Sequence, residues 1–341
     1  MAERIKIGQI GIGHNHSEGK MSAVLKFPEL YDVIGYSEDN PDWVEARGQM
    51  PCYRDLPRLS EDEIIARSDA VIVETDVWNL TKTAQKCIDA GKHIHMDKPA
   101  SGTLEEYKHL LDTAKEKNLV VQLGYMYRYN PAVKKCFELI REGKLGEIFS
   151  INAEMSTYHT PVYKNWLTNF GGGIMYILGS HFVDLIVYLL GKPEKVTPFL
   201  KHTLLDGIDF PDNNLAVLEY EKALARIFIS SVEVNGWGRR QFMVSGSKGT
   251  VNIVPMENTV RMTYSDTTMT PTPYADFKEE IPVSDIPPSC RYDEMMQDFY
   301  DYVMGTKENP FTYEHDYAVQ EVLADIVGGI RFHGTKPGIG I

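Results

Sequence analysis

Lys6-Ile7-Gly8-Gln9-Ile10-Gly11-Ile12-Gly13-His14-Asn15-His16 joins an apolar run to a turn that contains two glycines. An apolar run of this kind is typical of a buried strand in a parallel sheet. Glycines after such a strand let the backbone approach a pyrophosphate, and a helix that starts beyond them presents free N–H groups to the same anion. The third glycine of the usual fingerprint is replaced by His16, and a Gly-x-Gly alone is also typical of any tight strand-to-helix turn. The stretch indicates a dinucleotide-binding turn, which the flanking sequence has to support.

Short apolar runs alternate with helical patterns over the first third of the chain. The apolar runs are Ile5–Ile12, Val33–Tyr36, Ala70–Val73, His93–Met96 and Leu119–Leu123. The amphipathic stretches between them lie near Lys20–Phe27, Glu61–Ala66, Leu80–Ala90 and Leu104–Lys117. This alternation predicts parallel β-α-β units. Glu38 follows the second run, where a carboxylate accepts hydrogen bonds from a ribose 2′-OH and repels a 2′-phosphate. We therefore expect NAD as the cofactor in preference to NADP.

The pattern changes after about Tyr125, where strand-like segments begin to dominate. They are Ile148–Tyr158, Leu215–Tyr220, Ala225–Val234, Gln241–Ser245, Thr250–Val254 and Thr259–Tyr264. Short links between some of them predict antiparallel neighbours. Helical patterns cover Pro131–Arg141, Ile174–Leu190, Asp293–Met304 and Tyr317–Phe332. The chain is therefore predicted to hold an α/β domain over residues 1–125 and an α+β domain, on an open-faced and mostly antiparallel sheet, over residues 126–341.

Charge, cysteines and hydropathy narrow the range of partners and compartments. The formal net charge of −13 argues against a nucleic acid or an anionic membrane as partner, because such surfaces need clustered Lys and Arg. The four cysteines lie far apart and form no paired motif, which indicates free thiols in a reducing compartment. No apolar run approaches the ~20 residues that span a bilayer, and the chain enters a strand at once without a signal peptide. We expect a cytoplasmic protein.

Three further segments carry motifs in a fixed order and spacing. The first, from Ala90 to Pro99, is a strand that ends in Asp97-Lys98-Pro99, and the second runs from Gly124 to Pro131 and leads through a helix to Gly143-Lys144-Leu145-Gly146-Glu147-Ile148. The third combines Gly171-Gly172-Gly173, Gly179-Ser180-His181-Phe182-Val183-Asp184 and Leu189-Leu190-Gly191. Together these segments resemble the Gfo/Idh/MocA family of oxidoreductases, and the resemblance covers nearly the whole chain.

The resemblance implies an amino-terminal Rossmann domain with a doubly wound parallel sheet, an open-faced sheet domain, and an active site in the crevice between them. It implies oxidation or reduction of secondary alcohols of sugars, polyols and related cyclic compounds with NAD or NADP. The family's Glu-Lys-Pro motif matches Asp97-Lys98-Pro99, and its Gly-x-His-x-x-Asp motif matches Gly179 through Asp184. The resemblance makes Lys98 the lysine at the nicotinamide and His181 the general acid/base.

The chemistry of these residue types agrees with the implied roles. A neutral imidazole suits removal of the hydroxyl proton as the hydride leaves, and an ammonium stabilises negative charge on the same oxygen. Without the family pattern, Lys98 would be interpreted as a surface lysine at a strand end and His181 as a core histidine. With the pattern, catalysis is the preferred interpretation of both.

Two departures from the family pattern predict an atypical subfamily. Family dehydrogenases commonly carry an Asp four residues before the histidine, where this chain has Ile177. Asp184, at i+3 from His181, is a candidate to orient it, although the family more often uses that Asp structurally. The usual Thr-Pro-Asn stretch is altered over residues 75–79, where Trp78 either stacks near the nicotinamide or fills the space of the missing motif.

The predicted sites collect these residues. The expected cofactor contacts are Gly11, Gly13, His14, Asn15, His16, Glu38, Thr75, Trp78, Asp97 and Lys98. The expected substrate contacts are Arg128, His159, Tyr163, Trp166 and Asp184. Aromatic faces pack on the C–H faces of sugar rings, while core packing is the competing interpretation of each aromatic. No metal is expected, because alternating strand histidines point to opposite faces and no carboxylate or thiol cluster is evident beside His14 and His16.

An NAD-dependent dehydrogenase of a sugar, glycoside or cyclic polyol is the leading prediction, with two alternatives. An enzyme on the same scaffold uses bound NAD as a recycled oxidant, so that a glycosidic bond is cleaved or a centre epimerised without net redox change. A non-catalytic NAD-binding sensor is the other alternative. A homo-oligomer, either a dimer or a tetramer, is also expected, because an open sheet face rich in Val, Ile and Phe needs covering.

Overall fold

The computed structural model describes residues 3–257, 259–269, 272, 274 and 276–338, and it divides into two compact units. Unit 1 consists of residues 1–126, 287–321 and 330–341, and unit 2 of residues 127–286 and 322–329. The division at 126/127 lies one residue from the predicted boundary. The assignment of all residues from 126 to 341 to the second domain is wrong, because two carboxyl-terminal segments return to unit 1.

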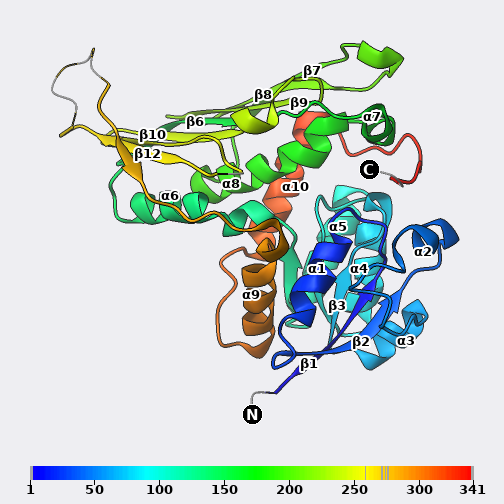
Figure 1. The fold of residues 1–341 in the computed structure, drawn as a ribbon. Helices are drawn as coiled ribbons and strands as arrows, with labels where there is room; N and C mark the ends of the chain where they lie inside the picture. Colours follow the sequence, from blue (N-terminus) through cyan, green and yellow to red (C-terminus); the bar gives the residue numbers. More distant parts are fainter. Residues whose placement is uncertain (1–2, 258, 270–271, 273, 275, 339–341) are drawn as a thin grey trace. The chain divides into compact units, whose positions relative to one another are not determined.

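Unit 1 is built on a five-stranded parallel sheet in the order β2-β1-β3-β4-β5 (Figure 1). The strands are β1 (Ile5–Ile10), β2 (Tyr31–Ser37), β3 (Ala70–Val73), β4 (His93–Met96) and β5 (Val121–Leu123). The side chains of β3 are buried along its whole length, as expected for a parallel strand with both faces covered. The reversal of strand order at β1 and β3 confirms the doubly wound Rossmann sheet.

Helices cover this sheet, and their starts follow local capping. They are α1 (Ser17–Leu25), α2 (Pro41–Arg47), α3 (Glu61–Arg67), α4 (Leu80–Asp89) and α5 (Leu104–Glu116). Capping boxes at Ser60 and Thr103 begin α3 and α5. Helix α2 was not predicted; Asn40 caps it and Pro41 occupies its first turn.

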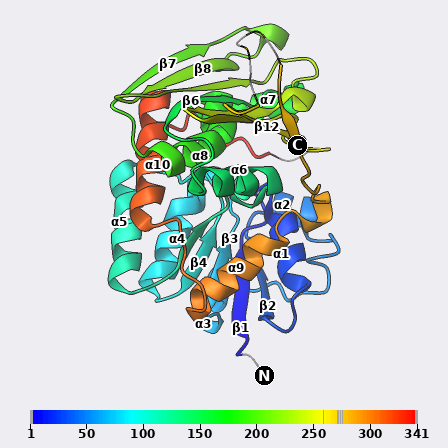
Figure 2. The same cartoon turned by 90° about the vertical axis from the view of Figure 1, so that its left-hand side faces the viewer.

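Helix α9 (Asp293–Met304) explains why a late segment belongs to unit 1. Its buried face carries Met295, Met296 and Phe299. The Tyr31 hydroxyl donates to the Met296 carbonyl at 2.5 Å, and Gln122 Nε2 donates to the Met295 carbonyl at 3.1 Å. Helix α9 packs against α1, as Figure 2 shows, so the predicted helix forms but covers the parallel sheet.

Unit 2 is built on an eight-stranded sheet in the order β13-β12-β11-β10-β6-β9-β8-β7. The strands are β6 (Ile148–Glu154), β7 (Lys195–Lys201), β8 (Asn213–Glu219), β9 (Leu224–Ser230), β10 (Gln241–Gly246), β11 (Gly249–Ile253), β12 (Met262–Asp266) and β13 (Glu279–Ile281). All neighbours are antiparallel except β6 and β9. Burial alternates along β8 and β11, so one face is packed, which confirms the mostly antiparallel sheet. Strands β7 and β13 were not predicted.

The helices of unit 2 are α6 (Pro131–Arg141), α7 (Pro161–Leu167) and α8 (Ser180–Leu190), with a π-helical turn at Met175–Gly179. Helices α6 and α8 lie along one face of the sheet in Figures 1 and 2. Short 3₁₀ turns occur at Val77–Asn79, Met126–Tyr129, Leu205–Gly207, Trp237–Arg239 and Pro288–Cys290.

Helix α10 (Tyr313–Val327) starts and ends earlier than predicted. The Thr312 hydroxyl accepts the His315 N–H at 3.2 Å and caps the start, and Gly328 and Gly329 end the helix with φ of 69° and 92°. The helix contributes to both units, because residues up to 321 belong to unit 1 and those from 322 to unit 2.

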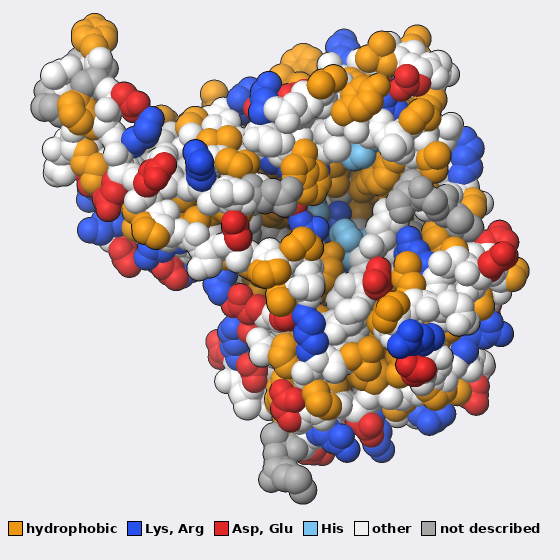
Figure 3. All heavy atoms as spheres, in the orientation of Figure 1, with side chains coloured by type: hydrophobic (Ala, Val, Ile, Leu, Met, Phe, Trp, Pro, Cys, Tyr) orange, Lys and Arg blue, Asp and Glu red, His pale blue; other side chains and the backbone are white. Residues whose placement is uncertain are grey.

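Acidic and basic side chains are interspersed on the face shown in Figure 3. Elsewhere on the surface, Lys108 and Asp112 of α5 form an exposed ion pair at 2.6 Å. Among the helices of the described residues, none combines the length and the apolar character that crossing a membrane requires.

Candidate functional site

The dinucleotide turn needs its first two glycines for close packing. Gly11 has a φ of 85°, and a Cβ there would lie 2.5 Å from the Thr75 Cα, where the turn crosses the end of β3. A Cβ on Gly13 would lie 2.7 Å from Trp43 Nε1. His16 occupies the N-cap of α1 with φ −97° and ψ −5°, a conformation open to any residue. The third glycine of the fingerprint is therefore not needed here.

Two residues of α2, which the sequence analysis did not single out, hold this turn. Arg47 Nη1 donates to the carbonyls of Ile12 at 2.9 Å and His14 at 2.5 Å. The Arg47 guanidinium carbon lies 4.6 Å from the centre of the Trp43 ring, and Trp43 Nε1 donates to Asp76 Oδ2 at 3.3 Å. The only local signal for this helix was the Asn40-Pro41 pair at its start.

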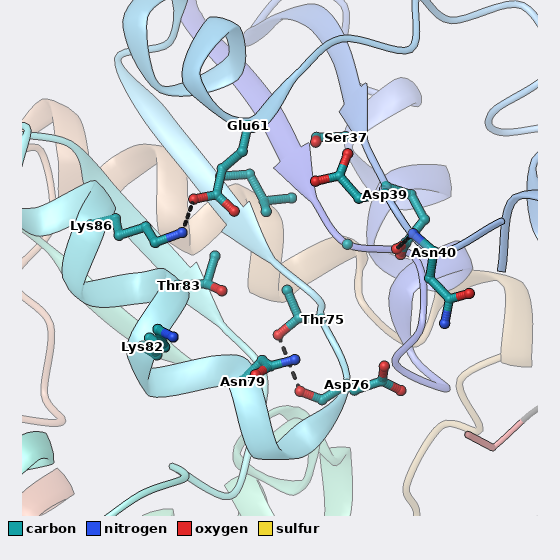
Figure 4. A pocket seen from close by; sticks show the side chains of 13 residues that line it. Ser37, Asp39, Asn40, Glu61, Thr75, Asp76, Asn79, Lys82, Thr83 and Lys86 are labelled. Atoms are coloured by element: carbon teal, nitrogen blue, oxygen red, sulfur yellow. Dashed lines mark hydrogen bonds and ion pairs between the residues drawn. The ribbon is translucent and has the colours of Figure 1, made fainter. Parts of the chain in front are cut away.

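A hollow of about 380 Å³ opens beside the turn, at the carboxyl ends of β1, β2 and β3 (Figure 4). Figure 4 shows Asp39 and Asn40 on one side and Lys82, Thr83 and Lys86 of α4 on the other. The lining residues are Ile10, Gly11, Ser37, Glu38, Asp39, Asn40, Glu61, Thr75, Asp76, Asn79, Lys82, Thr83 and Lys86. The hollow therefore contains Gly11, Glu38 and Thr75 from the predicted cofactor set.

Carboxylates outnumber ammonium groups in this hollow. Glu38 also supports the turn, because its two carboxylate oxygens accept the N–H groups of Ile12 and Asn40, each at 2.9 Å. Lys86 is paired with Glu61 at 2.5 Å. Burial raises the pKa of Asp76 to about 6, so this carboxyl is mostly ionised at neutral pH. The hollow is suited to hydroxyl groups that donate hydrogen bonds, and it opposes an additional phosphate.

A buried ionic cluster lies directly beyond the turn. The Lys20 ammonium on α1 is fully buried, with Nζ 3.0 Å from Glu74 Oε1, 2.8 Å from Asp97 Oδ2 and 2.8 Å from His95 Nε2. Burial lowers the pKa of Lys20, but the Asp97 and Glu74 carboxylates outweigh it and raise the pKa above its ordinary value. Burial, and then the Lys20 ammonium, lower the pKa of His95 to about 3. The cluster therefore joins α1 to the ends of β3 and β4.

His14 and His16 complete the cluster from the turn. Nδ1 of His14 lies 3.3 Å and Nδ1 of His16 lies 3.0 Å from the same oxygen, Asp97 Oδ2. Burial lowers the pKa of both imidazoles. Burial raises the pKa of Asp97, but His14, Lys20 and His16 together hold it well below its usual range. The premise that no carboxylate lies near these histidines is wrong, because the sheet brings Asp97 and Glu74 to them.

Lys98 is placed by this same cluster. Its backbone N–H donates to Asp97 Oδ1 at 2.6 Å, and its side chain is buried at the carboxyl end of β4. The interpretation of Lys98 as a surface lysine is wrong. Asn15 is at the rim of the turn, where its Oδ1 accepts from Arg47 Nη2 at 3.4 Å, and Trp78 is half-buried in the turn that follows Asp76.

His181 lies in unit 2, near the start of α8, immediately beyond the π-helical turn. Such turns are rare and are frequently found at functional sites. The side chain is buried, and its ring meets the edge of the Tyr127 ring with centroids 4.9 Å apart and an interplanar angle of 86°. Ile177 lies within the π-helical turn and is buried, so this position supplies an apolar side chain where the family commonly has a carboxylate.

Tyr127 connects His181 to a buried polar network. The Tyr127 hydroxyl donates to the Glu257 carboxylate, which also accepts from Arg240 Nη1. Arg240 further donates to the Tyr127 oxygen at 3.2 Å and to the Thr157 hydroxyl at 2.7 Å. Sequence reasoning assigned no role to Tyr127, although it lies in the motif segment from Gly124 to Pro131, and it missed Arg240 and Glu257, which belong to no motif and are far from Tyr127 in the chain.

Arg128 and Asp184 form a buried bidentate pair. Arg128 Nε lies 3.0 Å from Asp184 Oδ2, and Arg128 Nη2 lies 2.6 Å from Asp184 Oδ1. Because the two charges face each other, the geometry favours a structural role for Asp184 over the orientation of His181. Nε and Nη2 of Arg128 are therefore both hydrogen-bonded within unit 2.

The predicted aromatic residues form one cluster around α7. The rings of His159 and Tyr163 stack at 4.3 Å with an interplanar angle of 10°, and Trp166 lies 5.4 Å from Tyr163. Trp166 is buried, as core packing requires, while His159 and Tyr163 are partly exposed. Burial, and then Arg240 and Lys164, lower the pKa of His159 to about 3, so its imidazole is neutral.

Comparisons with known proteins match both halves of the chain. Residues 5–125 match a model described as an oxidoreductase family with an NAD-binding Rossmann fold, and residues 133–252 match the GFO/IDH/MocA C-terminal domain. The chain is 29% identical over 201 residues to scyllo-inositol 2-dehydrogenase (NADP(+)) of Bacillus subtilis, covering 57% of this chain and 54% of that protein.

Two further relatives extend the comparison. The chain is 23% identical over 271 residues to 2,7-anhydro-N-acetylneuraminate hydratase of Escherichia coli, covering 73% of this chain and 67% of that protein. Its fold is similar to that of levoglucosan dehydrogenase in complex with NADH and levoglucosan, with a TM-score of 0.81, 18% identity, and coverage of 96% of this chain and 97% of the other. At this identity the structural likeness shows the fold alone.

Proposed function

Since the chain belongs to the Gfo/Idh/MocA family of oxidoreductases, we propose that it transfers a hydride between a secondary alcohol and the nicotinamide of NAD. The observation that carries this proposal is the placement of Lys98. The backbone N–H of Lys98 donates a hydrogen bond to the Asp97 side chain, and the same carboxylate is hydrogen-bonded to His16 of the dinucleotide turn. An ammonium beside the cofactor turn is suited to stabilise negative charge on the substrate oxygen.

His181 takes the hydroxyl proton in this proposal. Imidazole is the most common general base in enzymes, and the Tyr127 ring restricts the orientation of the His181 ring. Lys98 lowers the cost of the alkoxide character that develops as the hydride leaves. The partly exposed rings of His159 and Tyr163 are suited to bind a sugar face and its hydroxyls.

The substrate class that fits unit 2 is an uncharged sugar, glycoside or cyclic polyol. The buried cations Arg128 and Arg240 each have a carboxylate partner, in Asp184 and Glu257 respectively. A ligand that brought its own carboxylate would have to compete with these pairs. The relative named as a scyllo-inositol dehydrogenase supports the same class.

Turnover with a panel of sugars, inositols and glycosides tests the proposal. We expect reduced-nicotinamide absorbance to grow with NAD and at least one uncharged compound. Product formation without net NADH would instead establish the recycled-oxidant alternative. The relative named as a hydratase and the apolar Ile177 support that alternative. NAD binding without any product would establish the sensor.

We propose NAD in preference to NADP, since the hollow beside β2 is lined by Glu38, Asp39, Glu61 and Asp76. The Asp39→Arg variant is expected to shift the ratio of kcat/KM for NAD over NADP toward NADP by about tenfold or more, because a charged partner for the 2′-phosphate replaces a repelling charge. Asp55→Arg makes the same charge change at an exposed site outside the hollow and should leave the ratio unchanged. Equal use of both cofactors by the unmodified protein would contradict the preference.

The outer face of the unit 2 sheet supports a homo-oligomer. Phe199 pairs with Leu215 and Leu215 with Phe228 across β7, β8 and β9, which forms an apolar row, and Phe199 is 48% exposed. Covering such a row with a second copy removes apolar surface from water. Light scattering should give a multiple of the chain mass, and Leu215→Asp should shift it toward the monomer. A monomeric unmodified protein would rule the proposal out.

A further inference from the structure

The buried cluster beside the dinucleotide turn has the donor atoms of a metal site. One ligand atom each of His14, His16 and Asp97 lie within 4.8 Å of one another. In a tetrahedral zinc site with bonds of 2.0–2.1 Å, neighbouring donor atoms lie about 3.3 Å apart. The distances from Asp97 Oδ2 to His16 Nδ1 and His14 Nδ1 are 3.0 and 3.3 Å, and His14 Nδ1 lies 3.5 Å from Glu74 Oε2.

Glu74 supplies a second, independent observation. Its side chain is fully buried, and within the described part of the chain its Oε2 accepts no hydrogen bond. The other oxygen, Oε1, is held by the Lys20 ammonium at 3.0 Å. A buried carboxyl oxygen without a hydrogen bond is costly, and a bound ion, a water or a proton shared with Asp97 would satisfy it.

The hydrogen-bond pattern of His14 points the same way. His14 Nδ1 accepts the backbone N–H of His16 at 3.3 Å, which requires a lone pair on that nitrogen. The same nitrogen faces Asp97 Oδ2 and Glu74 Oε2, which also carry lone pairs. An imidazole nitrogen has one lone pair, so His14 Nδ1 would give up its contact with the His16 N–H on binding a cation, which would then lie between that lone pair and the two carboxyl groups.

We propose that His14, His16 and Asp97 bind a divalent transition-metal ion, with zinc as the expected metal and a water as the fourth donor. Imidazole and carboxylate donors in this combination suit zinc, cobalt and iron. The backbone N–H of Lys98 already donates to the other oxygen of Asp97, a contact that would fix the orientation of this carboxylate toward a metal. His16 is 21% exposed, so the ion has a path from solvent.

The charges of Lys20 and Lys98 affect the affinity of this site for a metal ion. Both ammonium groups oppose a further cation, whereas the pyrophosphate of NAD brings two negative charges to the same turn. We therefore expect NAD to tighten metal binding, and by linkage the metal to tighten NAD binding by the same factor. The metal would tie the turn to the end of β4.

Cobalt titration of the full-length, chelator-treated protein tests the proposal, with the visible absorption of tetrahedral Co²⁺ as readout and elemental analysis for zinc content. We expect one equivalent per chain, tighter with NAD present. His14→Gln and His16→Gln should each weaken Co²⁺ binding by at least about tenfold. Lys20→Met should tighten it, because an opposing charge is removed.

The matched control is His109→Gln on the exposed face of α5, which should bind Co²⁺ like the unmodified protein. Circular dichroism establishes that each variant is folded. Failure of the unmodified protein to bind one saturable equivalent, with or without NAD, would overturn the proposal by itself and leave a water or a shared proton in the cluster. Binding that survives both histidine substitutions would also overturn it. These readouts do not depend on the alcohol substrate.

Discussion

Replacing His181 by Asn is expected to lower kcat/KM for the alcohol substrate by about 10²–10⁴-fold, because a general base contributes this much to proton removal. Asn keeps a polar side chain of similar size but cannot take up the hydroxyl proton. The Tyr127 ring and the network of Arg240 and Glu257 stay in place, so unit 2 should remain folded. Lys98→Met should have an effect of the same order, through loss of charge stabilisation at the substrate oxygen.

Steady-state kinetics across pH separates these roles from a structural one. In the His181→Asn variant, the limb of the kcat/KM profile that reports the base should disappear, which a packing defect would not cause. His202→Asn, on an exposed histidine of unit 2 paired with Asp209, is the matched control and should retain full activity. Lys108→Met serves the same purpose for Lys98. Unchanged turnover in His181→Asn would assign the base to another residue.

Lys20→Met is expected to lower the free energy of unfolding by about 3–5 kcal/mol, since removing one partner of a buried ion pair leaves uncompensated charge. The substitution keeps the length of the side chain but leaves Asp97 and Glu74 without their ammonium. Both carboxylates have no exposed side-chain surface, so water cannot replace the lost partner. The loss should be smaller in the zinc-loaded protein, where the ion supplies positive charge.

Urea denaturation of the full chain measures this effect. Lys108→Met is the matched control, because it removes an exposed i,i+4 pair with Asp112 and should cost no more than about 0.5 kcal/mol. The double variant Lys20→Met/Glu74→Gln removes an ammonium and a carboxylate together and should recover part of the loss. A loss below about 1 kcal/mol in Lys20→Met would mean that the cluster does not stabilise unit 1.

Local signals in the sequence were sufficient to predict most of the individual helices and strands. Helices α6 and α9 begin and end at the predicted residues, because Asn130 caps the first and Gly305 ends the second in a left-handed conformation. The strands β3 and β4 also match, since short apolar runs between helices leave few alternatives. The family motifs in the sequence also marked the cofactor turn, Lys98 and His181 as candidate site residues.

Some short helices and edge strands were not predicted from the sequence, for a physical reason. Helix α2 has seven residues, of which Trp43 alone is buried, so no amphipathic period is visible in its sequence. Strand β7 is at an edge of its sheet and is mostly exposed, so it lacks the alternation that marked β8. The contacts that Arg47 and Trp43 make with the dinucleotide turn could not be inferred without that helix.

Patterns along the chain were enough to predict two domains, one with a parallel sheet and a dinucleotide turn and one with a mostly antiparallel sheet, and to assign the motif residues to each. The surface that α9 covers and the side chains that meet at the turn depend on contacts between distant segments, which no local pattern encodes. Lys20 on a helix, Glu74 after β3 and Asp97 after β4 are each ordinary in their local context. They become one buried cluster because parallel strands that neighbour in the sheet end at the same edge, and periodicity along the chain carries no information about that meeting.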